Sequence, residues 1–119
     1  TCTITPYGSG CGPVLAGGAV TTGGRHVITL LMTGGFPNSF ALALTGTQAL
    51  NLSLGGGCYL LSNGVAVALL PTDAQGDATQ VWKVPVSVPG RSFHQFLPIA
   101  LQGQSLVLQA SNGLKVECR

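Results

Sequence analysis

Very few side chains in this sequence could carry out acid–base or nucleophilic chemistry. The histidines and carboxylates are His26, His94, Asp73, Asp77 and Glu117. A hydrolytic triad needs a histidine beside a serine and a carboxylate, and no G-x-S-x-G segment marks a nucleophile. We interpret both histidines as partly exposed strand residues. The sequence therefore predicts a protein that is not an enzyme and that carries no cofactor.

Two of the carboxylates, Asp73 and Asp77, share one turn. The run from Asp73 to Gly76 has ordinary turn chemistry, in which the aspartate bonds its own backbone and the glycine adopts a positive φ. A weaker alternative is a Ca²⁺ site, because two carboxylates and turn carbonyls could supply oxygen ligands. Two acidic groups are few for calcium, so the turn is the preferred interpretation and no metal site is predicted.

The sulfur chemistry is more informative, because the cysteines are even in number: Cys2, Cys11, Cys58 and Cys118. They contain no C-x-x-C and no histidine stands near them in sequence, so the usual zinc signatures are absent. Disulfides are the better interpretation, and they place the chain in an oxidising compartment. The ends of compact domains often lie close together, which favours Cys2–Cys118 with Cys11–Cys58. In the alternative, a terminal cysteine bonds a neighbouring subunit.

The composition excludes several classes of partner. Charged residues make up only 7% of the chain, and the net charge of +2 comes from scattered side chains. A nucleic-acid surface needs clustered basic residues, so no nucleic-acid partner is expected. The longest apolar runs, 27–32 and 65–70, are far too short to span a bilayer. A surface of uncharged polar groups repels its own copies weakly and so tolerates close packing between them.

Period-2 alternation and frequent turns predict the elements that carry these residues. Alternation is clear over 1–5, 40–45 and 50–54, and Asn63-Gly64 predicts a hairpin that joins 58–62 to 65–70. Pro85 within 78–88 indicates an edge position or a bulge. We expect about nine short strands in an all-β, disulfide-stapled β-sandwich of immunoglobulin-like or jelly-roll type. It would comprise one domain over 7–119, preceded by an N-terminal strand or arm over 1–6.

Several turn sequences recur in a fixed order: residues 7–11 (YGSGC), 36–38 (FPN), 55–60 (GGGCYL), 72–78 (TDAQGDA), 108–110 (LQA) and 111–114 (SNGL). In this order they resemble a secreted β-domain at the C-terminal ends of large, cysteine-poor extracellular proteins of certain environmental bacteria. The resemblance implies a Cys11–Cys58 pair and no particular activity. This chain differs in standing alone and in adding Cys2 and Cys118 outside the shared region.

These features predict a structural subunit of an extracellular bacterial assembly, such as a filament or surface layer, whose partners are copies of itself. The chain would be secreted, at the cell surface or outside it. Strand addition to a neighbour's sheet would use the N-terminal residues, because main-chain hydrogen bonds supply affinity while alternate side chains fill pockets. The residues concerned are Thr1, Cys2, Thr3, Ile4, Thr5 and Pro6. The alternative is an extracellular carbohydrate- or cell-surface-binding module, for which Trp82 is the candidate that could stack on a glycan.

Overall fold

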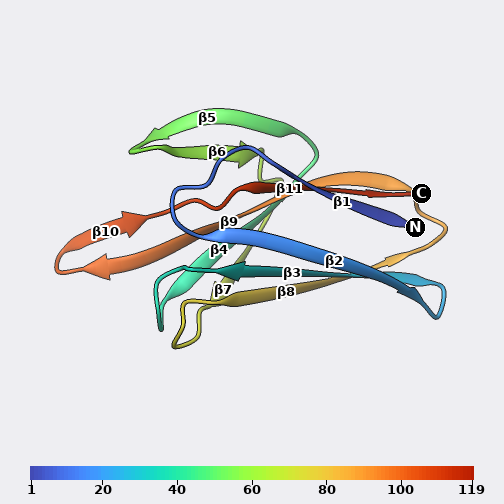
Figure 1. The fold of residues 1–119 in the computed structure, drawn as a ribbon, viewed down its shortest axis with the longest axis horizontal. Coiled ribbons are helices and arrows are strands. Elements are labelled where there is room, and N and C mark those ends of the chain that lie inside the picture. Colours follow the sequence, from blue (N-terminus) through green and yellow to red (C-terminus); the bar gives the residue numbers. More distant parts are fainter.

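Eleven β-strands and no helix make up the computed structural model, which describes all 119 residues (Figure 1). The strands are β1 (Cys2–Tyr7), β2 (Val14–Thr22), β3 (Arg25–Thr33), β4 (Phe40–Gly46), β5 (Ala49–Gly55), β6 (Cys58–Ser62), β7 (Ala66–Pro71), β8 (Ala78–Pro85), β9 (Gly90–Gln102), β10 (Ser105–Leu108) and β11 (Gly113–Cys118). The predicted all-β class is confirmed, with more strands than expected. The chain therefore forms no helix that could span a bilayer.

The strands form three antiparallel sheets. Five strands of a six-stranded sheet have the order β1-β11-β9-β4-β7, and the sixth, β10, pairs with the C-terminal end of β9. A three-stranded sheet has the order β2-β3-β8, and β5 pairs with β6 in a separate hairpin. Gly23 and Gly24 join β2 to β3, both with positive φ, as the tight hairpin turns that suit strand twist require. The two larger sheets face each other, which makes the fold a β-sandwich.

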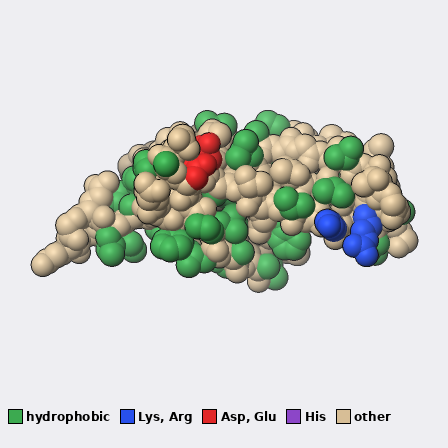
Figure 2. Space-filling view, turned by 90° about the horizontal axis from the view of Figure 1, so that it is seen from below, with side chains coloured by type: hydrophobic (Ala, Val, Ile, Leu, Met, Phe, Trp, Pro, Cys, Tyr) green, Lys and Arg blue, Asp and Glu red, His purple; other side chains and the backbone are tan.

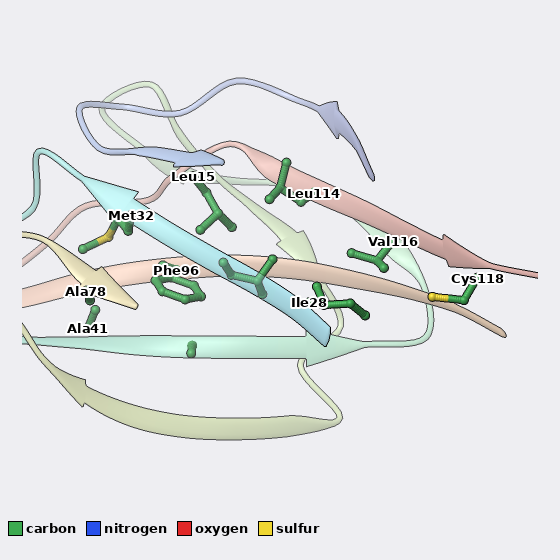
Figure 3. Packing of buried hydrophobic residues seen from close by; sticks show 11 residues of the cluster. Leu15, Ile28, Met32, Ala41, Ala78, Phe96, Leu114, Val116 and Cys118 are labelled. Atoms are coloured by element: carbon green, nitrogen blue, oxygen red, sulfur yellow. The ribbon is translucent and has the colours of Figure 1, made fainter. Parts of the chain in front are cut away.

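The main core lies between the two larger sheets (Figure 3). Burial alternates along β3, so that Ile28, Leu30 and Met32 point inward from the three-stranded sheet. Against them pack the small Ala41 and the large, fully buried Phe96 of the six-stranded sheet, along with side chains of β2 and β11. Period-2 alternation therefore gives each sheet one apolar inner face, as expected for a sandwich.

A second, smaller core covers part of the outer face of the six-stranded sheet. Leu44 and Leu97 pack there with Leu60 of β6 and the Cys11–Cys58 disulfide. The alternation of large and small residues over 40–45 thus serves both cores, because the alanines face inward and the leucines lie under the β5–β6 hairpin. Gln95 of β9, fully buried, bonds the backbone of β6 and holds the hairpin to the sheet.

The predicted hairpin at Asn63-Gly64 is wrong. β6 pairs with β5, and β7 pairs with β4, so the two residues connect different sheets. The Asn63 side chain instead binds the turn between β4 and β5, accepting from the Thr47 amide at 2.9 Å and donating to the Thr47 hydroxyl at 3.1 Å. Gly64 does adopt the positive φ of 58° that its turn chemistry predicts, so the local conformation is right and the pairing partner is not. Pro85 ends β8, an edge strand, as proline requires.

Candidate assembly surface

The N-terminal segment forms strand β1 within the chain's own six-stranded sheet. It pairs antiparallel with β11 over its whole length, from Cys2 opposite Cys118 to Tyr7 opposite Gly113. The two ends of the chain are also joined, because the Thr1 amino group donates to the Arg119 carbonyl at 3.1 Å. Figure 1 shows the termini side by side. No strand of the chain pairs with the other edge of β1, so its main-chain groups on that side stay open to a further strand.

Both disulfides close within one chain. Cys2–Cys118 joins directly opposed residues of β1 and β11, and Cys11–Cys58 ties the loop before β2 to the first residue of β6. These are the pairs expected from the sequence, and no cysteine is left free. Two disulfides fit an oxidising compartment.

The strands at the ends of the two larger sheets carry almost no charge. β1 and β7 end the six-stranded sheet, and β2 and β8 end the three-stranded sheet. β1, β2 and β7 contain no charged residue, and the only charged residue of β8 is Lys83. Natural sheets usually protect such edges with charged side chains, prolines or bulges. Here Pro6 and Pro71 near the strand ends are the main protection of β1 and β7.

An open groove of about 750 Å³ lies between the edge strands β1 and β2. No charged side chain lines it; the apolar side chains along it are Ile4, Pro6, Tyr7, Val14, Leu15, Ala16 and Leu114. Asn112 bonds both backbone groups of Leu15, at 2.9 and 3.0 Å, and so takes the place of a paired strand at one point of β2. The rest of the groove combines main-chain edges with apolar walls, which is what an added β-strand needs.

The outer face of the three-stranded sheet is also largely apolar. Exposed on it are Val14, Val20, Leu31 and Val81, with threonines, a glycine and an alanine between them. Its formally charged residues are Arg25 and Lys83, both near one end of the sheet. Figure 2 shows a face of the molecule on which apolar side chains spread over the surface, with the acidic and basic groups well apart.

A further apolar area lies on the six-stranded sheet beyond the β5–β6 hairpin. Val67 and Leu69 of β7 are each 57% exposed, and Phe40 of β4 is about half exposed. A groove of about 430 Å³ continues this area toward the β9–β10 hairpin, where Leu101 and Leu106 are largely exposed. Large exposed apolar areas mark protein or membrane contacts, ligand-binding grooves or aggregation-prone surfaces.

The two histidines are buried, which corrects the prediction that they are partly exposed. Each is 2% exposed, because each lies on the inner face of its strand. Hydroxyl groups satisfy them: Thr21 lies 2.8 Å from His26 Nδ1, and Ser92 lies 2.7 Å from His94 Nε2. Burial lowers the pKa of His94 to about 4, so its imidazole is neutral at physiological pH. Neither ring has a carboxylate among its hydrogen-bond partners, so no hydrolytic triad forms.

Asp73 forms the turn that its sequence predicts. Its Oδ1 accepts hydrogen bonds from the amides of Gln75 and Asp77, both at 2.9 Å, and Gly76 has a φ of 80°. Gly76 also lies against Gly35, so closely that an added Cβ would overlap the Gly35 backbone. The carboxylate of Asp73 thus stabilises the backbone of its own turn.

Trp82 packs against the main core rather than standing free on the surface. Its ring lies 6.3 Å from the ring of His94, and its Nε1 is buried without a hydrogen-bond partner. With Gln80, it lines a cavity of about 100 Å³ between β7 and β8. The indole is therefore only partly exposed.

The structure also brings together residues that sequence spacing keeps apart. His26 lies beside the Cys2–Cys118 disulfide, with the possible ligand atoms of the three residues within 4.8 Å of one another. The sequence offers little sign of this, since His26 is far from both cysteines along the chain. The only signal is the alternation in β3, which places His26 on the same inward face as Ile28.

Comparison with known proteins found nothing similar: no protein-family model matches the chain, and neither the curated proteins nor the solved structures yielded a match.

Proposed function

We propose that this protein is a structural subunit of an extracellular assembly that grows by contacts between sheet edges of successive copies. The observation that carries the proposal is the nearly uncharged set of edge strands β1, β2, β7 and β8. Open strand edges without charges are templates for pairing with another chain, and a protein that stays monomeric protects them. The low total charge and the apolar outer faces support the same conclusion.

The six-stranded sheet supports a specific arrangement of the copies. Its open edges, β1 and β7, have the same length of six residues and lie at opposite ends of the strand order. A contact between β1 of one copy and β7 of the next leaves one free β1 and one free β7. Such a contact joins different surfaces, so it propagates into an open filament unless rotation closes a ring. Contacts of β1 with β1 would instead stop at a dimer.

The side chains at the two edges fit this contact. Val67 and Leu69 of β7 are each more than half exposed. Beside β1, the groove between β1 and β2 has apolar walls that could bury such side chains. Main-chain hydrogen bonds between the edges would then supply affinity, and the groove would supply specificity. The two disulfides suit a subunit that works outside the cell, where thiols do not stay reduced.

Single lysine substitutions test this arrangement, because an edge lysine blocks strand pairing. Leu69→Lys blocks β7, and Thr3→Lys blocks β1. Glu117 lies opposite Thr3 on β11 and can pair with the new lysine charge. Leu52→Lys on the β5–β6 hairpin is the matched control, since Leu52 is 56% exposed and Leu69 is 57% exposed. Electron microscopy and sedimentation velocity report the size of the assemblies.

We expect the unmodified chain and Leu52→Lys to polymerise, and each edge variant alone to remain monomeric. A mixture of Leu69→Lys and Thr3→Lys still contains one free β1 and one free β7, so it should form dimers and nothing larger. Absence of any ordered polymer of the unmodified chain would refute the proposal. Polymers that lose their order equally in Leu52→Lys and Leu69→Lys would refute the role of β7.

A further inference from the structure

Cys2, His26 and Cys118 form a three-residue cluster at the end of the sandwich where the chain termini meet. They come from three strands: Cys2 from β1, Cys118 from β11, and His26 from β3 of the opposite sheet. The atoms that could bind a metal lie within 4.8 Å of one another. His26 and Cys118 are buried, so the cluster is largely screened from solvent.

One of the two neutral tautomers of His26 suits metal binding. The Thr21 hydroxyl lies 2.8 Å from Nδ1, directly across the β2–β3 pair from His26. When Nδ1–H donates to this hydroxyl, Nε2 carries the lone pair. Histidines that bind metals commonly hold their other ring nitrogen in this way, which fixes the tautomer and the ring orientation.

We propose that the chain binds one Zn²⁺ through Cys2, Cys118 and His26 when the Cys2–Cys118 disulfide is reduced. Two thiolates and one imidazole are ligands that Zn²⁺ prefers, with a fourth position left for water. Two thiolates balance the charge of the ion, so the complex is neutral and suits a buried place. Cys11 and Cys58 have no third ligand of this kind beside them. Cys2, His26 and Cys118 are the one group of three possible metal ligands that the structure brings together.

A small thiol reductant supplies the electrons and protons that reduce the Cys2–Cys118 disulfide. Two thiol molecules deliver two electrons and two protons to the disulfide, which becomes two cysteine thiols, while the reductant becomes its own disulfide. Binding of Zn²⁺ then releases the two thiol protons. A small-molecule disulfide, the oxidised form of the reductant, runs the exchange in reverse: it takes up the two electrons and becomes two thiols, Cys2 and Cys118 form their disulfide again, and Zn²⁺ is released to solvent.

The two states connect different parts of the fold. The disulfide joins β1 to β11, which are neighbours in one sheet. Zinc would also bind His26 of β3 and so tie the six-stranded sheet to the three-stranded sheet. A chain that has not yet been oxidised would thus hold this end of the sandwich closed, with both termini in place.

The test measures zinc binding to the reduced chain without oxygen, by competition with a chromophoric chelator. Cobalt is the spectroscopic probe, since bound thiolates give an intense sulfur-to-cobalt absorption. The double variant Cys11→Ser/Cys58→Ser isolates the proposed site, and Cys2→Ser/Cys118→Ser removes it. His26→Gln removes the nitrogen ligand, and His94→Gln is the matched control, because His94 is equally buried and lies outside the cluster.

We expect one Zn²⁺ per reduced chain and none for the oxidised chain. Loss of an outer-shell partner alone weakens metal sites by roughly 10- to 100-fold, so His26→Gln should weaken binding at least about tenfold. If the reduced chain unfolds without metal, Zn²⁺ should restore its near-ultraviolet circular dichroism in the Cys11→Ser/Cys58→Ser variant and fail to do so when His26→Gln is added. The proposal is overturned if this double variant neither binds nor refolds with Zn²⁺, or if His26→Gln and His94→Gln bind it equally.

Discussion

Replacing Gln95 by leucine should destabilise the protein by about 3 kcal/mol or more, because this side chain satisfies three backbone groups at buried or part-buried positions. Its Oε1 accepts from the Leu61 amide at 2.9 Å, and its Nε2 donates to the carbonyls of Tyr59 and Ser111 at 2.7 and 3.0 Å. Gln95 is 0% exposed, so water cannot take over these bonds without opening the fold. Each orphaned group costs about 1–3 kcal/mol. Three such groups are a large fraction of the roughly 5–15 kcal/mol that stabilises a typical domain.

The matched control is Gln80→Leu, which makes the same chemical change at a site with the opposite hydrogen bonding. Gln80 Oε1 is buried without a partner, so its removal should be neutral or stabilising. Equilibrium unfolding in urea, with both variants at the same pH and with intact disulfides, gives the two changes in free energy. Equal destabilisation by the two substitutions would refute the reasoning, because the loss would then reflect shape and not hydrogen bonding.

Three further predictions concern pH, backbone space and the disulfides. Burial lowers the pKa of His94 to about 4. The histidine of the unfolded chain titrates near 6.5, so as the pH falls the unfolded chain binds a proton before the folded chain does. The free energy of unfolding should therefore fall by roughly 3 kcal/mol from about pH 6.5 to about pH 4. Urea titrations across this range should show the slope, and His94→Gln should remove most of it. Gly113→Ala should destabilise, because the new methyl group overlaps the Tyr7 ring, whereas Gly18→Ala meets nothing within 4 Å and should gain about 0.4–1 kcal/mol in thermal or urea melts. Loss of Cys11–Cys58 in a double serine variant should cost up to about 4 kcal/mol for its separation of 47 residues, and a cost near zero would show that the bridge does not constrain the unfolded chain.

Much of the fold could be predicted because its signals are local. The alternation over 40–45 predicts a strand from side chains two residues apart, and the structure places β4 there. The Asp73 turn follows from one carboxylate and its own backbone, and it forms as expected. Such signals need no knowledge of distant parts of the chain, because turn chemistry and strand period act over a few residues.

The errors arise where the outcome depends on distant partners. Asn63 and Gly64 have the local chemistry of a hairpin turn, yet the strands on either side do not pair with each other: β6 pairs with β5, and β7 pairs with β4. For His26 the alternation along β3 is the only local sign of burial. Both histidines lie on the inner faces of their strands, beside hydroxyls that replace water. In both cases the burial of apolar faces determines the result, and the chain within a few residues does not specify which faces meet.

By itself, the sequence determined the all-β class, most strand positions, the scarcity of charge and an even set of cysteines that fits an oxidising compartment. These are properties of composition and of short segments. Only the tertiary structure decided that β1 pairs with β11, that β1 and β7 end the same sheet, and that His26 lies beside Cys2 and Cys118. Main-chain hydrogen bonds are the same for every pair of strands, so they do not select which strands pair. Packing of the whole sandwich makes that selection, and it depends on residues that lie far apart in the sequence.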